Sequence, residues 1–475
     1  MLLALVVMPI VLGALALVVP WARVRAWLVP AGAVVHAALT AVVVISPPSP
    51  MFDRWMTLGA LGRVIVAILS AQYLVCSFYV PGYLAARPER PNRVFCACLI
   101  ALGGTMSLVA VSHHLGLMWV GIETSTLVTA PLIYFHRTPR SLEATWKYLL
   151  IGSVGIAFAL YGSFFLASAA LHNGLSTSLL FEDMVHDAAR MSKPWLHAAF
   201  VILLVGYGTK IGLAPMHTWK PDVYGEAPGI VGALLAGGLT TCAFCALLRF
   251  VQIMNAAGDG ELARSLLLAF GLLSIAVAAA FMIRQRDVKR MLAYSSVEHM
   301  GIVAFGLGIG GLGTYGALLH ILSNSFGKGV LFLAAGNLHR TYGSKLAAEV
   351  SGAIHRVPAS ACLLLAGFFA ITGSPPFSLF LSELTIVQAA FRAGRYAVAG
   401  LFLALLATVF IGMGAVVVRV VQGPARAGTK PEHEPLLTIA PALGCLAIVL
   451  VLGIYLPPWL DSALHTAARF VEMQS

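Results

Sequence analysis

The chain has 475 residues, of which 59% are hydrophobic and only 10% are charged, and its formal net charge is +11. A soluble protein of this length could not cover so much apolar surface, so we predict an all-α, multi-pass membrane protein and exclude a soluble enzyme. The basic residues lie in loops between apolar runs, which is typical of membrane topology and argues against nucleic-acid binding.

Runs of about 20 apolar residues are long enough to cross a bilayer as helices. We predict fourteen such spans, at residues 2–20, 27–46, 61–81, 93–112, 114–135, 143–170, 195–217, 229–253, 264–283, 291–310, 313–338, 359–391, 398–421 and 434–456. The charged segment 171–193 is expected to be a surface loop with a short amphipathic helix. The mixed tail at 457–475 is expected to lie along the membrane interface.

Lysine and arginine are unevenly divided between the two sets of loops. The odd-to-even connections hold 18 of them, including Lys220, Lys289 and Arg426, whereas the opposite side holds 8. Loops rich in positive charge stay in the cytoplasm. We therefore predict a bacterial cytoplasmic (inner) membrane protein with both termini outside.

The seventh span combines a lysine with a helix break. Lys210 lies in the stretch GYGTKIGLAPMHTWKPD, five residues before Pro215. A charge at membrane depth costs roughly 2.5–3.5 kcal/mol on insertion scales, and proline interrupts a helix; both are tolerated where the backbone lines a polar cavity. Lys210 is thus a candidate for an ion path, and the alternative is a lysine that snorkels to the interface. His217, just after the break, is either a relay residue or a loop histidine.

The twelfth span repeats this combination. Gly373, Pro375 and Pro376 interrupt it, and Glu383 follows. Because the two broken spans are five spans apart, we predict two five-helix repeats of opposite orientation, formed by spans four to eight and nine to thirteen. The predicted segments are the N-terminal helices at 1–92, the repeats at 93–253 and 254–421, and the last helix with its tail at 422–475.

Charges inside the spans follow the same order in both repeats. They are Glu123, Lys147 and Lys210 in spans five, six and seven, and Glu298, Lys328 and Glu383 in spans ten, eleven and twelve. A nearby ammonium favours the ionised form of a buried carboxylate, so we expect Glu123 to pair with Lys210. Lys147 is the other possible partner, but it lies only about five residues into its span and can instead snorkel to the surface.

The eleventh span has a polar stripe. His320, Asn324 and Lys328 recur every four residues and so share one helix face. Histidine and buried lysine change protonation readily, which suits a proton relay; the alternative is a hydrogen-bonded seam between helices. Glu298 and His299 in the tenth span form either the entry of a half-channel or a polar helix start.

The cysteines do not indicate a redox or metal centre. Cys242 and Cys245 form a C-x-x-C within an apolar span, without a second pair, and are interpreted as structural. No iron–sulfur, haem or zinc spacing, nucleophile elbow or phosphate loop is visible. We therefore predict no cofactor, no metal and no catalytic centre of its own.

Five stretches resemble the antiporter-like proton-conducting subunits of respiratory complex I, membrane-bound hydrogenases and multisubunit sodium/proton antiporters. They are GIETSTL, KIGLAPMHTWKPDVYGEAP, DVKRMLAYSSVEHMGI, LHILSNSFGKGVLFL and GSPPFSLFLSEL. Within this superfamily, RTPRSLEATWKYLLIGSVGIAFAL, AYSSVEHMG and GSPPFSLFLSELTI are most similar to the hydrogenase-4 component F group.

The resemblance implies inverted five-helix repeats and roles in proton transfer for Glu123, Lys210, Lys328 and Glu383. Two positions depart from the pattern, since many relatives have histidine in place of Asn324 and lysine in place of Glu383. The implied function is a proton-translocating, non-redox subunit of a hydrogenase-type complex such as formate hydrogenlyase, whose partner subunits hold the metal centres. The alternatives are a subunit of an NADH–quinone oxidoreductase, or a transporter without redox coupling, such as a sodium/proton antiporter or an inorganic-carbon uptake module.

Overall fold

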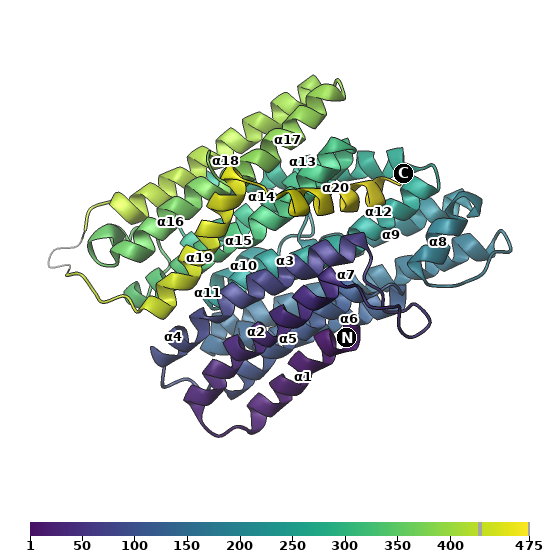
Figure 1. Cartoon of the computed structure of the whole chain (residues 1–475). Helices are drawn as coiled ribbons and strands as arrows, with labels where there is room; N and C mark the ends of the chain where they lie inside the picture. The colour runs from purple at the N-terminus through teal and green to yellow at the C-terminus, as the bar shows by residue number, and fades with distance from the viewer. Residues whose placement is uncertain (426–429, 474–475) are drawn as a thin grey trace.

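The computed structural model describes residues 1–425 and 430–473, and this part of the chain is helical, with a few isolated β-bridges and no strands (Figure 1). Arg426 and the last two residues of the predicted tail lie outside the described residues. The helices of the first half are α1 (Leu2–Val18), α2 (Ala22–Ile45), α3 (Ala60–Ser77), α4 (Tyr79–Ala85), α5 (Arg93–Val111), α6 (Leu115–Ile133), α7 (Pro139–Leu171), α8 (Phe181–Asp187), α9 (Lys193–Ile211), α10 (Lys220–Glu226), α11 (Gly229–Leu234) and α12 (Thr240–Ala256).

The second half continues the same pattern. Its helices are α13 (Gly260–Met282), α14 (Val288–Ile309), α15 (Leu312–Tyr342), α16 (Pro358–Ile371), α17 (Ser378–Arg392), α18 (Tyr396–Gln422), α19 (Leu436–Ile454) and α20 (Pro458–Glu472). Twelve of these helices or continuous helix pairs are long and apolar enough to span a membrane, and α1 and α16 are shorter apolar helices. Each of the fourteen predicted spans therefore coincides with a helix or a pair of helices, and the predicted multi-helix membrane fold is confirmed.

Both predicted helix breaks are present. Helix α9 ends at Ile211, because Gly212 adopts a left-handed conformation with φ of 75° and Pro215 follows three residues later. The chain resumes as the short helix α10. Likewise, α16 ends at Ile371 and α17 begins at Ser378, with Gly373 at φ of 65° in between. Each broken span therefore consists of two helices joined by a short non-helical segment.

The long helix α15 occupies the centre of the bundle. It packs against α11, α14, α16, α17 and α19, and its most apolar segment is buried throughout. The helices farther out expose large apolar side chains, for example Leu150 on α7 and Ile411 on α18, which is the pattern expected of a lipid-facing surface. Polar side chains on α15 are therefore held inside protein rather than lipid.

Two segments outside the predicted spans also contain helices. The loop between α7 and α9 contains the short helix α8, as predicted, and Arg54 anchors it through Asp183 at 3.1 Å. The tail forms α20, which crosses over α3, α12 and α15 (Figure 1). Glu472 near its end accepts hydrogen bonds from Arg264 at 2.6 Å and from Thr314. The position of α20 relative to a membrane interface and the division into four segments stay predictions.

Candidate functional site

The buried polar groups converge on α14. Its N-terminus is capped by Asp287, whose carboxylate accepts hydrogen bonds from the amides of Lys289 and Arg290. One to three turns further along, Ser295, Ser296, Glu298 and His299 are all buried. A polar helix segment of this kind is tolerated at membrane depth only because other protein segments surround it.

Two lysines from different helices bind to α14. Lys328 on α15 donates to Ser295 Oγ at 2.7 Å, and Lys220 at the start of α10 donates to Ser296 Oγ at 3.1 Å. Both side chains are fully buried. Neither ammonium has a carboxylate within 4 Å in the described part of the chain. Adjacent serines on one helix therefore link a cation from each half of the protein.

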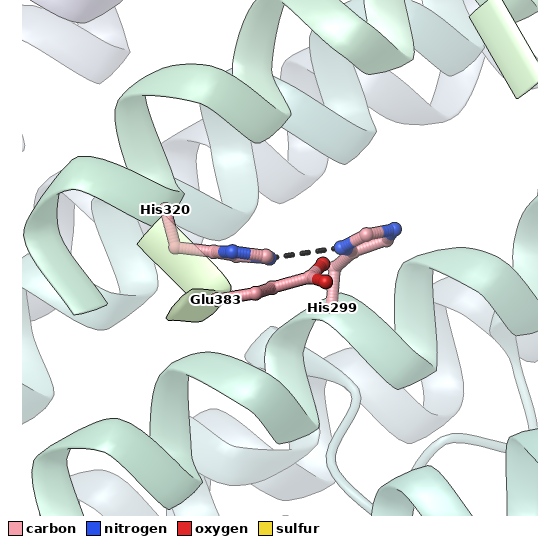
Figure 2. A group of neighbouring side chains, drawn as sticks. All are labelled: His299, His320 and Glu383. Carbon is pink, nitrogen blue, oxygen red and sulfur yellow. Dashed lines mark hydrogen bonds between the residues drawn. The ribbon is translucent and has the colours of Figure 1, made fainter. Parts of the chain in front are cut away.

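Further along α14, His299 begins a hydrogen-bonded series that continues through His320 on α15 to Ser382 on α17. Figure 2 shows the bond between the two histidines. Ser382 Oγ donates to the carbonyl of Leu379 at 2.7 Å, so it accepts from His320 Nδ1 at 2.9 Å. His320 Nε2 then carries a lone pair and accepts the proton on His299 Nδ1, at 2.8 Å. The partners thus determine the tautomer of both imidazoles, which hold their protons on Nδ1.

Glu383, in the second turn of α17 after the second helix break, completes this cluster. Its carboxylate lies beside the two imidazoles, and one ligand atom of each of the three side chains lies within 4.8 Å of the others. Gly373 borders this cluster: its φ of 65° disfavours other residues, and a Cβ at that position would force the Glu383 carboxylate to shift. Glu383 itself is only partly buried, and Pro375 and Pro376 in the break are exposed.

Lys210 lies deep in the first half, but not in the predicted ion pair. It is buried in the last turn of α9, donates to Thr126 Oγ1 and lies 4.9 Å from the ring centre of Tyr148. Glu123 instead accepts a hydrogen bond from Ser153 Oγ at 3.1 Å, and its other oxygen has no partner among the described residues. Glu123 and Lys210 thus make no direct contact within 4 Å, although Glu123 is the carboxylate whose charge acts on Lys210. The Lys210 ammonium instead donates to Thr126, which lies one turn from Glu123 on α6.

Lys147 does not belong to the buried series. Helix α7 begins at Pro139, four residues earlier than predicted, so Lys147 lies about two turns into the helix. Its side chain is 42% exposed and pairs with Glu143 at 2.7 Å and Asp222 at 2.8 Å. These contacts favour the alternative in which Lys147 reaches the protein surface, and its place relative to the membrane stays a prediction.

Two lysines that we assigned to loops are buried instead. The stem of Lys220 packs against Gly212 in the break, and its ammonium lies near the rings of Trp219 and Tyr224, at 6.0 and 5.8 Å. Lys289 donates to the carbonyl of Ala227. The helix break was the sequence feature that could have indicated the buried position of Lys220, because the short helix that follows the break is mostly buried.

Aromatic rings fill the space between Lys210 and Lys220. The rings of Tyr148 and Trp219 lie 5.3 Å apart, and Trp219 donates to the carbonyl of Thr209 at 2.8 Å. His217 is also buried in the break, 6.4 Å from the ring of Tyr294. The His217 side chain lies beside these buried groups, but it makes no hydrogen bond to the ammonium of Lys220.

Asn324 lies one turn from both His320 and Lys328 on α15. It is buried, and its side-chain oxygen has no hydrogen-bond partner in the described structure. The predicted polar stripe on the eleventh span thus faces α14 and α17 through His320 and Lys328. The geometry brings together Lys328, Glu298, His299, His320 and Glu383, with Lys210 and Glu123 farther away in the first half.

Comparison with known proteins gives a consistent result. Residues 112–410 match the family described as NADH:quinone oxidoreductase/Mrp antiporter, TM. The chain is 36% identical over 360 residues to a hydrogenase-4 component F homolog of Methylacidiphilum infernorum, covering 74% of each chain. It is 30% identical over 351 residues to NADH-quinone oxidoreductase subunit N of Desulforudis audaxviator, covering 73% of this chain and 68% of the relative.

Solved structures show the same fold. A chain of the archaeal membrane-bound sulfane sulfur reductase superposes with a TM-score of 0.88 at 19% identity, covering 99% of this chain and 97% of that chain. A chain of respiratory complex I from Thermus thermophilus with bound aureothin superposes with a TM-score of 0.77 at 26% identity, covering 98% and 100%. The chain belongs to the NADH:quinone oxidoreductase/Mrp antiporter membrane family and is an antiporter-like, proton-translocating membrane subunit of the hydrogenase-4 or complex I type.

Proposed function

We propose that the chain is the proton-translocating, non-redox membrane subunit of a hydrogenase-type complex, such as formate hydrogenlyase. Its proton path would run through Glu123, Lys210, Lys220, Lys328, Glu298, His299, His320 and Glu383, with His217 beside it. The observation that carries this proposal is the arrangement on α14, where adjacent serines bind a lysine from each half and His299 begins a directed hydrogen-bonded series.

The lysines are suited to exchange protons. A buried ammonium that is held by a hydroxyl rather than directly by a carboxylate is not locked in its charged form, because a hydroxyl compensates only part of its loss of hydration. Lys220 and Lys328 are both in this state. Either lysine can therefore gain or lose its proton when a charge nearby changes.

The histidines provide a directional step. His299 Nε2 lies 3.9 Å from Glu298 Oε2 and has no hydrogen-bond partner in the described residues. When Glu298 delivers a proton to Nε2, the proton on Nδ1 passes to His320 Nε2, so that His299 returns to a neutral imidazole. His320 is then an imidazolium, and the Glu383 carboxylate beside it stabilises that charge.

The two ends of the proposed path lie on opposite flanks of the bundle, on α6 and α17 (Figure 1). Glu123 and Glu383 are only partly buried, and Ser153 next to Glu123 is exposed. A carboxylate that faced lipid at this depth would be costly. We infer that neighbouring membrane subunits cover both flanks, and that the redox and metal centres of the complex lie in its other subunits.

The parent complex can be identified by its partners. If the chain is purified from native membranes under mild conditions, mass spectrometry is expected to find a nickel–iron hydrogenase large subunit with it. Vesicles that contain this complex should take up protons when its electron donor is added, and an uncoupler should abolish the uptake. Co-purification of NADH- and quinone-binding subunits would favour the complex I assignment, for which the 30% identity to subunit N is the support. Small antiporter subunits without a redox partner would contradict both.

The orientation can be tested with single cysteines. Without the buried Lys220 and Lys289, the loop charges divide sixteen against eight, still in favour of termini outside a bacterial inner membrane. In a Cys362→Ser background, an impermeant thiol reagent added to intact cells should label Ser176→Cys and not Lys430→Cys; both positions are exposed. The opposite labelling pattern would reverse the topology.

A further inference from the structure

We propose that His299, His320 and Glu383 form a binding site for a divalent transition-metal ion of the Zn²⁺ type. The cysteine and histidine spacing in the sequence indicates no metal site, because these ligands come from three different helices, α14, α15 and α17. Both imidazoles are fully buried, and the carboxylate points at them (Figure 2). Binding to these residues does not depend on the proposed proton path.

The donor set selects the class of ion. Two imidazole nitrogens with one carboxylate oxygen suit Zn²⁺ and its neighbours, whereas Mg²⁺ and Ca²⁺ prefer oxygen ligands. With ligand distances of about 2.1 Å, two ligands of one ion lie at most about 4.2 Å apart. The ligand atoms lie within 4.8 Å of one another, and the two nitrogens are 2.8 Å apart. Closing the site therefore requires a rotation of the Glu383 side chain, and also a rotation of the imidazoles so that their facing nitrogens move apart and point at the ion.

The surroundings hold the histidines in the form that a metal needs. Metal-binding histidines donate their other ring N–H to an acceptor, which orients the ring. His320 already does this, since Nδ1 donates to Ser382 and Nε2 carries a lone pair that faces the cluster. For His299, the proton on Nδ1 moves to Nε2, where Glu298 Oε2 lies 3.9 Å away without a partner. Ser382 Oγ therefore accepts the proton that His320 keeps, and Glu298 Oε2 lies near the proton that His299 moves to Nε2.

Glu383 is the member of the cluster closest to the second helix break in sequence, so we infer that an ion enters from this side. Glu383 is partly exposed, and Pro375 and Pro376 at the surface of the break lie close to it in sequence. Lys328 opposes cation binding, because its ammonium is bound to Ser295 on the same helix as His299. The two carboxylates, Glu298 and Glu383, offset this repulsion. Occupancy would remove the proton between the two histidines, so on the proposed function it would also stop proton transfer.

The test is direct metal binding, independent of transport. The complex, purified with its native partners in lipid nanodiscs, is equilibrated with buffered Zn²⁺, and bound zinc per chain is measured by mass spectrometry after gel filtration. We expect one equivalent for the wild type and for His197→Asn, a control that removes a partly exposed histidine next to Asp259. His299→Asn, His320→Asn and Glu383→Gln should each lose this equivalent.

A milder variant protects the test against misfolding. Ser382→Ala removes only the acceptor of His320 and should weaken zinc affinity about 10- to 100-fold, as expected for a residue behind a ligand. Co²⁺ in place of Zn²⁺ should give a visible absorption band in the wild type that His320→Asn lacks. Equal zinc content in wild type and His320→Asn, or an unchanged affinity in Ser382→Ala, would overturn the site. Proton uptake measured with a chelator present tests the proposed path separately.

Discussion

Proton uptake by the complex is expected to fall by at least about 10²-fold when Lys220 is replaced with methionine, the size of loss seen when a proton-transfer group is removed. Lys220 connects the first helix break to α14 through Ser296, and no other described ammonium contacts that serine. Methionine has a similar length and fills the same space beside Gly212. The loss should therefore come from the missing titratable group rather than from altered packing.

The same substitution is expected to leave the chain folded, with thermal stability equal to or above that of the wild type. A buried ammonium without a carboxylate partner opposes folding, because it loses its hydration without an opposite charge. Uptake in vesicles and thermal unfolding in detergent would be measured together, with Ser296→Ala as the matched variant that keeps the lysine. A Lys220→Met complex that retained half of the wild-type uptake would remove this residue from the path.

A second large effect is expected for Lys210→Met, whereas Lys147→Met should change proton uptake by less than about 2-fold. Both residues are lysines near the first break, but their surroundings differ. Lys210 is buried and bound to Thr126, whereas Lys147 is 42% exposed and paired with two surface carboxylates. Exposed ion pairs of the second kind contribute about 1 kcal/mol or less to stability, so their loss is tolerated.

Comparing these two variants can contradict the expected roles of Lys210 and Lys147. Each protein is assembled with its native partners, and the uptake is divided by the amount of complex in the vesicles. If Lys147→Met is the variant that stops uptake, protons enter from the surface end of α7 and not through the last turn of α9. If neither variant changes uptake, Lys210 does not lie on the proton path.

The amino-acid sequence by itself determined the helices and the places where they break. Apolar run length sets where a chain can cross a bilayer, and this signal is local. Pro215 and the pair Pro375 and Pro376 interrupt helices through their own ring geometry, whatever surrounds them. The same is true of the depth of Lys210 and Lys328, because each lies within a largely apolar run of the sequence.

Only the tertiary structure decided which groups meet. Lys210 binds Thr126 rather than Glu123, and Lys220 enters the interior although its neighbours in sequence resemble a loop. The contact of His299 with His320 joins two helices, and Ser382 from a third orients it. Helix periodicity shows which face of a helix is polar, but the partner of that face depends on how helices from distant parts of the chain pack together.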